Sequence, residues 1–174
     1  MAYTVRLATL DDSTQIAKLG AHVFTVTFGH SVPPHELQAY LEETYSPLAV
    51  AAVLEDPQKN AHVAIDEDGN VLGFAILALG TTRACVENME NPVELQRIYV
   101  DTAVHGKGVG WMLADSIEKK ARKQGFRSIW LSVWEENQSA HKAYTKWGYK
   151  HVGDDDFIVG VVVQRDHIML KAFQ

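Results

Sequence analysis

The order of the predicted elements indicates an α/β protein with a mixed sheet and helices on both faces. Short alternating or apolar runs predict seven strands, and longer stretches with an apolar repeat of about 3.6 residues predict five helices. Along the chain they follow as one strand, three helices, three strands, a helix, a strand, a helix and two strands. No internal repeat or linker interrupts this series, which favours a single domain over residues 1–174.

The first half of the chain is predicted to form a strand, three helices and a pair of strands. Thr9 or Asp11 can cap the first helix, and Pro33-Pro34 separates it from the second. Ser46-Pro47 supplies an N-cap and a first-turn proline for the third helix, and Asp68-Gly69 is a hairpin turn signal. The predicted strands are residues 3–8, 61–65 and 71–79, and the second and third helices are residues 35–43 and 46–55.

The second half of the chain alternates strands with helices before two final strands. A helix over residues 111–124 follows a strand over residues 93–100, and its lysines and arginine suit a helix C-terminus. The remaining predicted elements are a strand at 127–133, a helix at 137–147 and strands at 149–158 and 161–170.

Composition and charge bound the class of function. A net charge of −6 argues against non-specific binding to nucleic acid, which requires clustered positive charge. The single Cys85 suits a reducing compartment, and the longest apolar run, residues 71–79, is too short to span a bilayer. We expect a cytoplasmic protein with a small-molecule substrate and neither a nucleic-acid nor a membrane partner.

The stretch His105-Gly106-Lys107-Gly108-Val109-Gly110 lies between a predicted strand and a predicted helix. Glycines at such a position let free backbone N–H groups and a helix N-terminus approach one anion closely. The pattern is neither the G-x-G-x-x-G of dinucleotide-binding folds nor a Walker A loop. Its alternative interpretation is a tight turn without a ligand.

Two motifs together resemble the GCN5-related N-acetyltransferases (GNAT). The resemblance covers essentially the whole chain and is strongest over residues 94–149. It rests on Leu95, Ile98, Tyr99 and Val100 before the turn, on the turn itself, and on Asn137, Ala140, Tyr144, Gly148 and Tyr149 after it. It implies a single N-acetyltransferase domain with a seven-stranded, mostly antiparallel mixed sheet, splayed central strands and acetyl-CoA as cosubstrate.

The resemblance also implies a set of cofactor-binding residues. In the family the turn binds the pyrophosphate, and N–H groups of the splayed strand hold the pantetheine and thioester. On this chain the set is Ile98, Tyr99, Val100, His105, Gly106, Lys107, Gly108, Val109, Gly110, Asn137, Ala140 and Tyr144. His105 departs from the family's usual Gln or Arg, so we expect cofactor binding to weaken as the pH rises through about 6.5.

Tyr144 and Glu94 are the predicted catalytic residues. The resemblance assigns Tyr144 the role of general acid, and a phenol of pKa ~10 can protonate a departing thiolate whose thiol has a pKa near ~8.5. The alternative for Tyr144 is aromatic packing on its helix. Glu94 is the candidate base for the attacking amine; a water chain, or a strand-end acid that only attracts the amine, are its alternatives.

The C-terminal segment and the Trp134-Glu135 pair look like PaiA-type spermidine/spermine N-acetyltransferases. That resemblance implies a polyamine acceptor, with Glu94, Trp134 and Glu135 as candidate substrate residues. Residues 154–156 are interpreted as a solvated acidic turn, and Gln164 and Asp166 as the polar face of a strand. Another amine (an amino acid, a drug, a protein N-terminus or a lysine) and a non-catalytic acyl-CoA-binding regulator stay open as alternatives, and the family makes a homodimer plausible.

Metal binding is not expected from the sequence. The eight histidines show no recognisable ligand spacing, and one cysteine cannot form a zinc–thiolate site. The four tryptophans are expected to pack in the core or on the sheet, with Trp134 the one given a substrate role.

Overall fold

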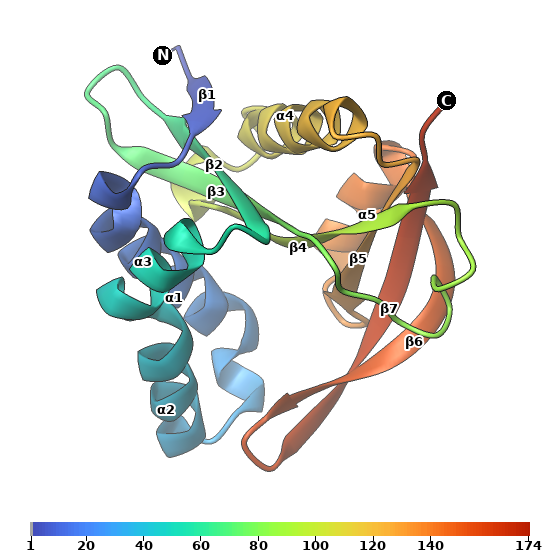
Figure 1. Cartoon of the computed structure of the whole chain (residues 1–174). Coiled ribbons are helices and arrows are strands. Elements are labelled where there is room, and N and C mark those ends of the chain that lie inside the picture. Colours follow the sequence, from blue (N-terminus) through green and yellow to red (C-terminus); the bar gives the residue numbers. More distant parts are fainter. Residues whose placement is uncertain (1) are drawn as a thin grey trace.

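The protein is built on a seven-stranded mixed sheet, seen in a computed structural model that describes residues 2–174 (Figure 1). The strand order is β1-β2-β3-β4-β5-β7-β6, and every neighbouring pair is antiparallel except β4 and β5. The strands are β1 (Thr4–Leu7), β2 (Lys59–Ile65), β3 (Val71–Ala78), β4 (Pro92–Val100), β5 (Ser128–Trp134), β6 (Lys150–Val159) and β7 (Val162–Ala172). The predicted seven-stranded, mostly antiparallel sheet is confirmed.

Helices cover both faces of the half of the sheet formed by β1 to β4. On one face lie α1 (Ser13–Phe28), α2 (Pro34–Tyr45) and α3 (Pro47–Glu55), and on the other lies α4 (Val109–Lys123). The fifth helix, α5 (Gln138–Lys146), follows β5, and three 3-10 turns complete the elements: η1 (Leu10–Asp12), η2 (Gly29–Ser31) and η3 (Thr102–Val104). Among the described residues no helix is long and apolar enough to cross a membrane.

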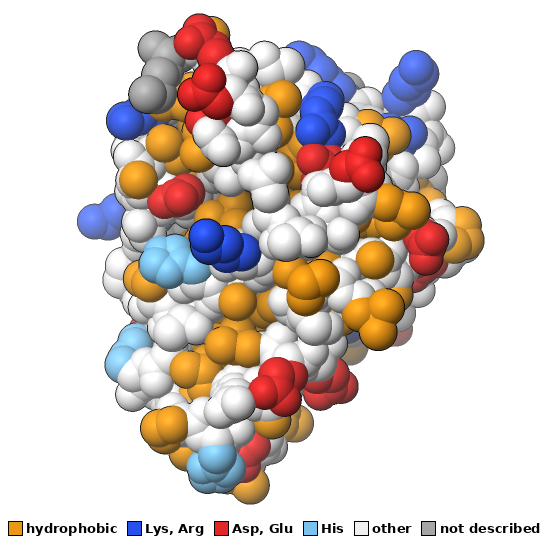
Figure 2. All heavy atoms as spheres, turned by 90° about the vertical axis from the view of Figure 1, so that its left-hand side faces the viewer, with side chains coloured by type: hydrophobic (Ala, Val, Ile, Leu, Met, Phe, Trp, Pro, Cys, Tyr) orange, Lys and Arg blue, Asp and Glu red, His pale blue; other side chains and the backbone are white. Residues whose placement is uncertain are grey.

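Alternation along the central strands supplies two hydrophobic cores. In β3, Ala75 and Leu77 face the core under α4, whereas Phe74 and Ile76 face the core under α1 to α3. Burial of each such large side chain contributes about 1.5–3 kcal/mol. Figure 2 shows the outer face over the N-terminal helices, with hydrophobic side chains along its middle and acidic, basic and histidine side chains spread around them.

The central strands β4 and β5 diverge after a short parallel contact. Their register ends at Glu94 opposite Trp130, although β4 continues to Val100 and β5 to Trp134. On its other side β4 carries a bulge at Gln96, where Leu77 pairs with Leu95 and Ile76 with Arg97. A bulge bends a strand and increases its twist, so it helps β4 turn away from β5. The predicted splay is confirmed.

Two local predictions are wrong. Asp154, Asp155 and Asp156 lie within β6 and not in a solvated turn, because β6 and β7 form one long hairpin whose tip lies at Gly160 and Val161. Trp111 is 44% exposed and packs on the surface against Trp147, because it lies in the first turn of α4 on the side away from the sheet.

Candidate active site

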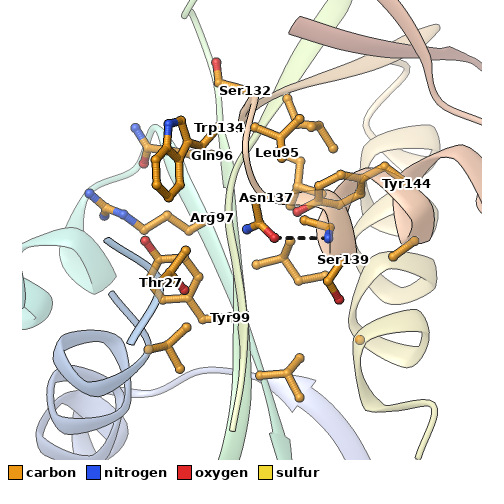
Figure 3. A pocket seen from close by; sticks show the side chains of 18 of the residues that line it. Thr27, Leu95, Gln96, Arg97, Tyr99, Ser132, Trp134, Asn137, Ser139 and Tyr144 are labelled. Carbon is orange, nitrogen blue, oxygen red and sulfur yellow. Dashed lines mark hydrogen bonds between the residues drawn. The ribbon is translucent and has the colours of Figure 1, made fainter. Parts of the chain in front are cut away.

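The splay between β4 and β5 opens into a cavity of about 720 Å³ that reaches both sides of β4 (Figure 3). One part is lined by the glycine turn at residues 105–110 and by the start of α5; we call it the turn side. The other part is lined by α1, Trp134 and the β6–β7 hairpin; we call it the hairpin side. Figure 3 shows Asn137, Ser139 and Tyr144 on the first side and Thr27, Arg97 and Trp134 on the second.

The glycine turn presents backbone N–H groups to the turn side. Gly106 and Gly108 have φ angles of 75° and 84°, a left-handed region that favours glycine. Gly108 is also the N-cap of α4, whose first N–H groups have no partner within the helix. A Cβ atom on Gly110 would lie 3.3 Å from the Trp147 ring, so the helix start packs closely on that side. The turn can therefore bind an anion.

His105 and Lys107 differ in their relation to this turn. The Nε2 atom of His105 lies 3.0 Å from the carbonyl oxygen of Val100, so the imidazole is held against the end of β4. Lys107 is exposed and does not line the cavity. The predicted weakening of cofactor binding at high pH stays a prediction. The other predicted cofactor residues all line the cavity: Ile98, Tyr99, Val100, His105, Gly106, Gly108, Val109, Gly110, Asn137, Ala140 and Tyr144.

Asn137 and Tyr144 are positioned by α5. The side-chain oxygen of Asn137 accepts a hydrogen bond of 3.2 Å from the Ala140 N–H and caps the helix (Figure 3). The Tyr144 ring packs edge-on against Trp147 and Tyr149, at 5.7 Å and 5.8 Å between centroids. Burial, and then the nearby Tyr99, raise the pKa of Tyr144 above its ordinary value, so the phenol keeps its proton at neutral pH.

The edge of β4 that faces β5 is free beyond Glu94. Residues 95–100 continue the strand without a strand partner on that side among residues 2–174, and they line the cavity. Backbone groups on such an edge need partners, which a bound ligand can supply. This geometry agrees with the prediction that Ile98, Tyr99 and Val100 offer N–H groups to a ligand.

Aromatic side chains form the walls of the hairpin side. The ring of Phe28 lies 5.3 Å from the Trp134 ring and 6.2 Å from the Phe157 ring, and Tyr40 meets Phe157 edge-on at 6.0 Å. Trp134 is 8% exposed. The sequence pointed to Trp134, but Tyr40 comes from the distant α2 and carries no local signal. Aromatic faces of this kind attract cations.

Three acidic residues of the cavity lining belong to this side: Glu94, Asp155 and Asp166. Asp155 forms an ion pair with Arg83, whereas the Oδ1 atom of Asp166 is buried and has no hydrogen-bond partner among residues 2–174. Burial, and then the charge of Asp155, raise the pKa of Asp166 to about 6. Glu94 is 7% exposed and forms no ion pair within the described part of the chain. Asp166 is thus a site candidate and more than the polar face of a strand.

Arg97 is a second residue that the sequence did not single out. It lines the cavity from β4, and its Cζ atom lies 5.3 Å from the centre of the Tyr45 ring. No carboxylate within residues 2–174 lies within 4.0 Å of its guanidinium nitrogens. Its position inside the predicted strand gave no sign of this, because the bulge at Gln96 decides which face Arg97 occupies.

Glu135 does not line the cavity. Its carboxylate lies 4.0 Å from Nε2 of His167, on the far side of the β6–β7 hairpin. His151 and Asp154 lie beside the same histidine, and the ligand atoms of these three residues lie within 4.8 Å of one another. The expectation that no metal binds rested on the lack of a histidine cluster in the sequence. In the folded chain, such a cluster forms.

The split sheet, the glycine turn at a helix start and the cavity between them form a site suited to an anionic ligand, beside a second chamber with acidic and aromatic walls. Comparison with known proteins gives the family. The Acetyltransferase (GNAT) family matches residues 25–149, and the chain belongs to this family of N-acetyltransferases. The predicted family and enzyme class are confirmed.

Individual relatives agree with this assignment. An uncharacterized N-acetyltransferase of Mycobacterium tuberculosis is 27% identical over 162 residues, which cover 93% of this chain and 98% of that protein. A spermine/spermidine N(1)-acetyltransferase of Bacillus subtilis is 31% identical over 124 residues, covering 68% of this chain and 76% of that protein. The fold is similar to that of PaiA N-acetyltransferase from Thermoplasma acidophilum, solved with coenzyme A: the TM-score is 0.80 at 21% identity, over 99% of this chain and 100% of that one.

Proposed function

We propose that residues 1–174 act as one N-acetyltransferase domain that transfers acetyl from acetyl-CoA to a primary amine, by direct attack in a ternary complex. The observation that carries this proposal is the continuous cavity through the splay of β4 and β5. It joins an anion-binding turn to a chamber with carboxylate and aromatic walls. Two substrates can therefore meet at the free edge of β4.

Acetyl-CoA fits the turn side. The N–H groups of the glycine turn would bind the pyrophosphate, and the free edge of β4 would bind the pantetheine amides and the thioester. Asn137 and Ala140 would line the other flank of the cofactor. The coenzyme A complex of the Thermoplasma acidophilum PaiA protein, which has a similar fold, supports this assignment.

The residues of the cavity can complete the transfer. The amine nitrogen forms a bond to the thioester carbon, and its proton passes to Glu94 or to a bound water. The N–H groups of β4 stabilise the oxyanion of the tetrahedral intermediate. When the carbon–sulfur bond breaks, Tyr144, which is protonated at neutral pH, donates its proton to the thiolate. The products are an N-acetyl amine and coenzyme A.

A polyamine is the acceptor that the hairpin side favours. A polyamine carries several ammonium groups along an aliphatic chain, and here both carboxylates and aromatic rings line the chamber. Glu94 lies next to the splay, whereas Asp166 lies opposite the end of β5, so the two could hold different nitrogens. The Bacillus subtilis relative named spermine/spermidine N(1)-acetyltransferase supports this choice.

Arg97 favours a second candidate, a zwitterionic amine such as an amino acid. A guanidinium that lines a cavity without a carboxylate partner is suited to bind a carboxylate of the ligand. An acceptor of this type would place its ammonium near Glu94 or Asp166 and its carboxylate at Arg97. This is the nearest alternative to the polyamine.

An amine screen tests both candidates. The protein is held with saturating acetyl-CoA, and coenzyme A release is measured with spermidine, spermine, single amino acids, aminoglycosides and lysine peptides. We expect spermidine or spermine to give the highest kcat/KM. Turnover of amino acids alone would overturn the polyamine proposal, and acetyl-CoA binding without turnover on any amine would indicate a non-catalytic acyl-CoA-binding protein.

A further inference from the structure

A second cluster of reactive side chains lies on the face of the β6–β7 hairpin that points away from the cavity. His151 and Asp154 belong to β6, and His167 belongs to β7. Each offers one nitrogen or oxygen atom, and these three atoms lie within 4.8 Å of one another. The proposed acetyl transfer uses none of the three.

The backbone of the hairpin brings these residues together. Asp154 and His167 are cross-strand partners, so their side chains share a face. His151 would point to the opposite face in a regular strand, but a bulge between His151 and Gly153 reverses it. Gly153 packs against Cys85, because a Cβ atom there would lie 2.7 Å from the Cys85 Cβ. The convergence is therefore a consequence of the fold and not of flexible side chains alone.

The donor atoms suit a divalent transition metal. The Nε2 atoms of His151 and His167 lie 2.8 Å and 3.9 Å from Oδ1 of Asp154. Ligands about 2 Å from a tetrahedral zinc ion lie roughly 3.3 Å apart, which falls between these two values. Two imidazoles and one carboxylate are a donor set that zinc, nickel and copper accept. We propose that His151, Asp154 and His167 bind one divalent ion of the zinc class.

Neighbouring groups can complete such a site. The carboxylate of Glu135 lies 4.0 Å from Nε2 of His167, so Glu135 or a water can supply a fourth ligand. The His141 ring from α5 lies 5.0 Å from the His167 ring. Side-chain exposures of 51%, 43% and 30% for His151, Asp154 and His167 leave the ion a path from solvent.

The ion would lie on the face of the hairpin opposite to the one that lines the hairpin side of the cavity. Asp155 and Asp166 are the next cross-strand pair along the hairpin, and both line the hairpin side. Successive residues of a strand point to opposite faces, so the ion and these carboxylates would occupy the two faces of the same hairpin segment. Metal binding would therefore hold the bulge between His151 and Gly153 in place, and with it the position of Asp155 and Asp166.

Zinc titration of the tag-free protein tests the proposal independently of acetyl transfer. Isothermal calorimetry with zinc chloride should give one ion per chain, and His151→Ala and His167→Ala should each weaken binding at least 10-fold. His35→Ala is the matched control, since its side chain is 80% exposed and lies in α2, and it should leave binding unchanged.

Two results would overturn the inference: no heat attributable to a single site, or the same zinc affinity in both cluster variants as in the wild type. Circular dichroism of each metal-free variant establishes that it is folded. If His167→Ala does not fold, His151→Ala decides the matter, because its side chain is about half exposed and its loss leaves the hairpin pairing intact.

Discussion

Asp166 is the residue for which the structure differs most from the sequence-based prediction. Its Oδ1 atom is buried without a hydrogen-bond partner in the described chain, on a wall that also carries aromatic rings. Burying a carboxylate without a partner costs free energy unless a ligand supplies the partner. At neutral pH, Asp166→Asn should therefore raise the free energy of unfolding by about 1 kcal/mol while it raises the KM for the amine at least 10-fold.

Denaturant unfolding and steady-state kinetics measure the two effects of Asp166→Asn, and Glu87→Gln, an exposed acid in the loop before β4, is the control. A purely structural Asp166 predicts no change in KM. A variant that is less stable and has an unchanged KM would contradict the role of Asp166 in holding the acceptor.

Tyr144 permits a clean test of the proton donor. Its hydroxyl makes no hydrogen bond within the described chain, and its ring packs against Trp147 and Tyr149. Tyr144→Phe should keep that packing and lower kcat about 100-fold or more, since general acids contribute about 10²–10⁴-fold. The Kd for acetyl-CoA, measured by calorimetry, should stay within about 3-fold. A loss of acetyl-CoA affinity with an unchanged kcat would assign Tyr144 to binding alone.

At the scale of single residues, the site residues that the sequence predicted are those that belong to contiguous motifs. The turn residues other than Lys107 line one cavity with Asn137 and Tyr144, as the resemblance implied. Asp166 and Arg97 were missed as site residues because a strand residue reveals its face only through its register. Glu135 lies beside His167 and outside the cavity lining, whereas its neighbour Trp134 lines the cavity, because successive residues point to opposite faces.

At the scale of elements, the glycine turn joins β4 to α4. Gly108 has a φ angle of 84°, and an alanine in that conformation costs roughly 1–2 kcal/mol. Gly108→Ala should therefore lower stability by about 1 kcal/mol and lower the affinity for acetyl-CoA at least 10-fold, because the turn relaxes away from the anion.

Gly69→Ala is the matched control for Gly108→Ala. Gly69 has a φ angle of 82° and open space where a Cβ atom would lie, but it belongs to the β2–β3 turn, far from the cavity lining. It should show the same loss of stability in thermal unfolding with an unchanged Kd for acetyl-CoA. An equal loss of affinity in both variants would mean that the turn acts only through global stability.

The turn before α1 contains a carboxylate, Asp12, whose contribution to the stability of the fold depends on pH. The carboxylate of Asp12 accepts hydrogen bonds of 2.7 Å and 2.8 Å from the Arg6 guanidinium and one of 2.8 Å from the Thr9 N–H. The hydrogen bonds from Arg6 are the main cause that lowers the pKa of Asp12 below its usual 3.8. A lowered pKa in the folded state means that Asp12 stabilises the fold above pH 3.8 and that this contribution is lost as the pH falls through the lowered value.

Asp12→Asn should thus lower the free energy of unfolding by about 2 kcal/mol at pH 7.5, the size of a charge-assisted hydrogen bond to a buried group. The difference from the wild type should shrink between about pH 4 and pH 2. Urea unfolding at several pH values measures it, with the exposed neighbour Asp11 changed to Asn as control. A difference that is constant with pH would show that the ionised carboxylate is not the stabilising form.

Element types and order followed from apolar patterning, because β3 and β5 are short apolar runs and α4 carries a 3.6-residue apolar repeat. The bulges could not be predicted in this way, because an extra residue in one strand is defined only by its pairing with the partner strand. The bulge near Gly153 and the long β6–β7 hairpin explain why residues 154–156 were mistaken for a turn.

At the scale of the whole molecule, the splay separates β1 to β4 from β5 to β7, and contacts beyond the sheet must hold the two halves together. Figure 1 shows the β6–β7 hairpin reaching back toward α2 on the open side of the splay. There the carboxylate of Glu36 in α2 lies against Gly160, and a side chain at residue 160 would require Glu36 to move. This contact joins the tip of the β6–β7 hairpin to α2.

One hydrogen bond of the same hairpin reaches the cavity wall. The Gln164 Nε2 donates to the Ser31 Oγ at 2.6 Å, and the Ser31 hydroxyl donates to the Phe28 carbonyl oxygen at 2.8 Å. Gln164 is 6% exposed, so its amide is shielded from water. Because Phe28 lines the cavity, these two hydrogen bonds connect the β6–β7 hairpin to the hairpin side of the cavity.

A double-mutant cycle on Ser31→Ala and Gln164→Ala measures this connection. We expect a coupling free energy of about 0.5–1.5 kcal/mol in denaturant unfolding, the usual net contribution of a hydrogen bond. Each single variant should raise the KM for the amine several-fold and leave the Kd for acetyl-CoA unchanged, because the turn side lies beyond β4. Additive stability effects, or a change confined to acetyl-CoA binding, would show that the Ser31–Gln164 hydrogen bond does not connect the hairpin to the hairpin side of the cavity.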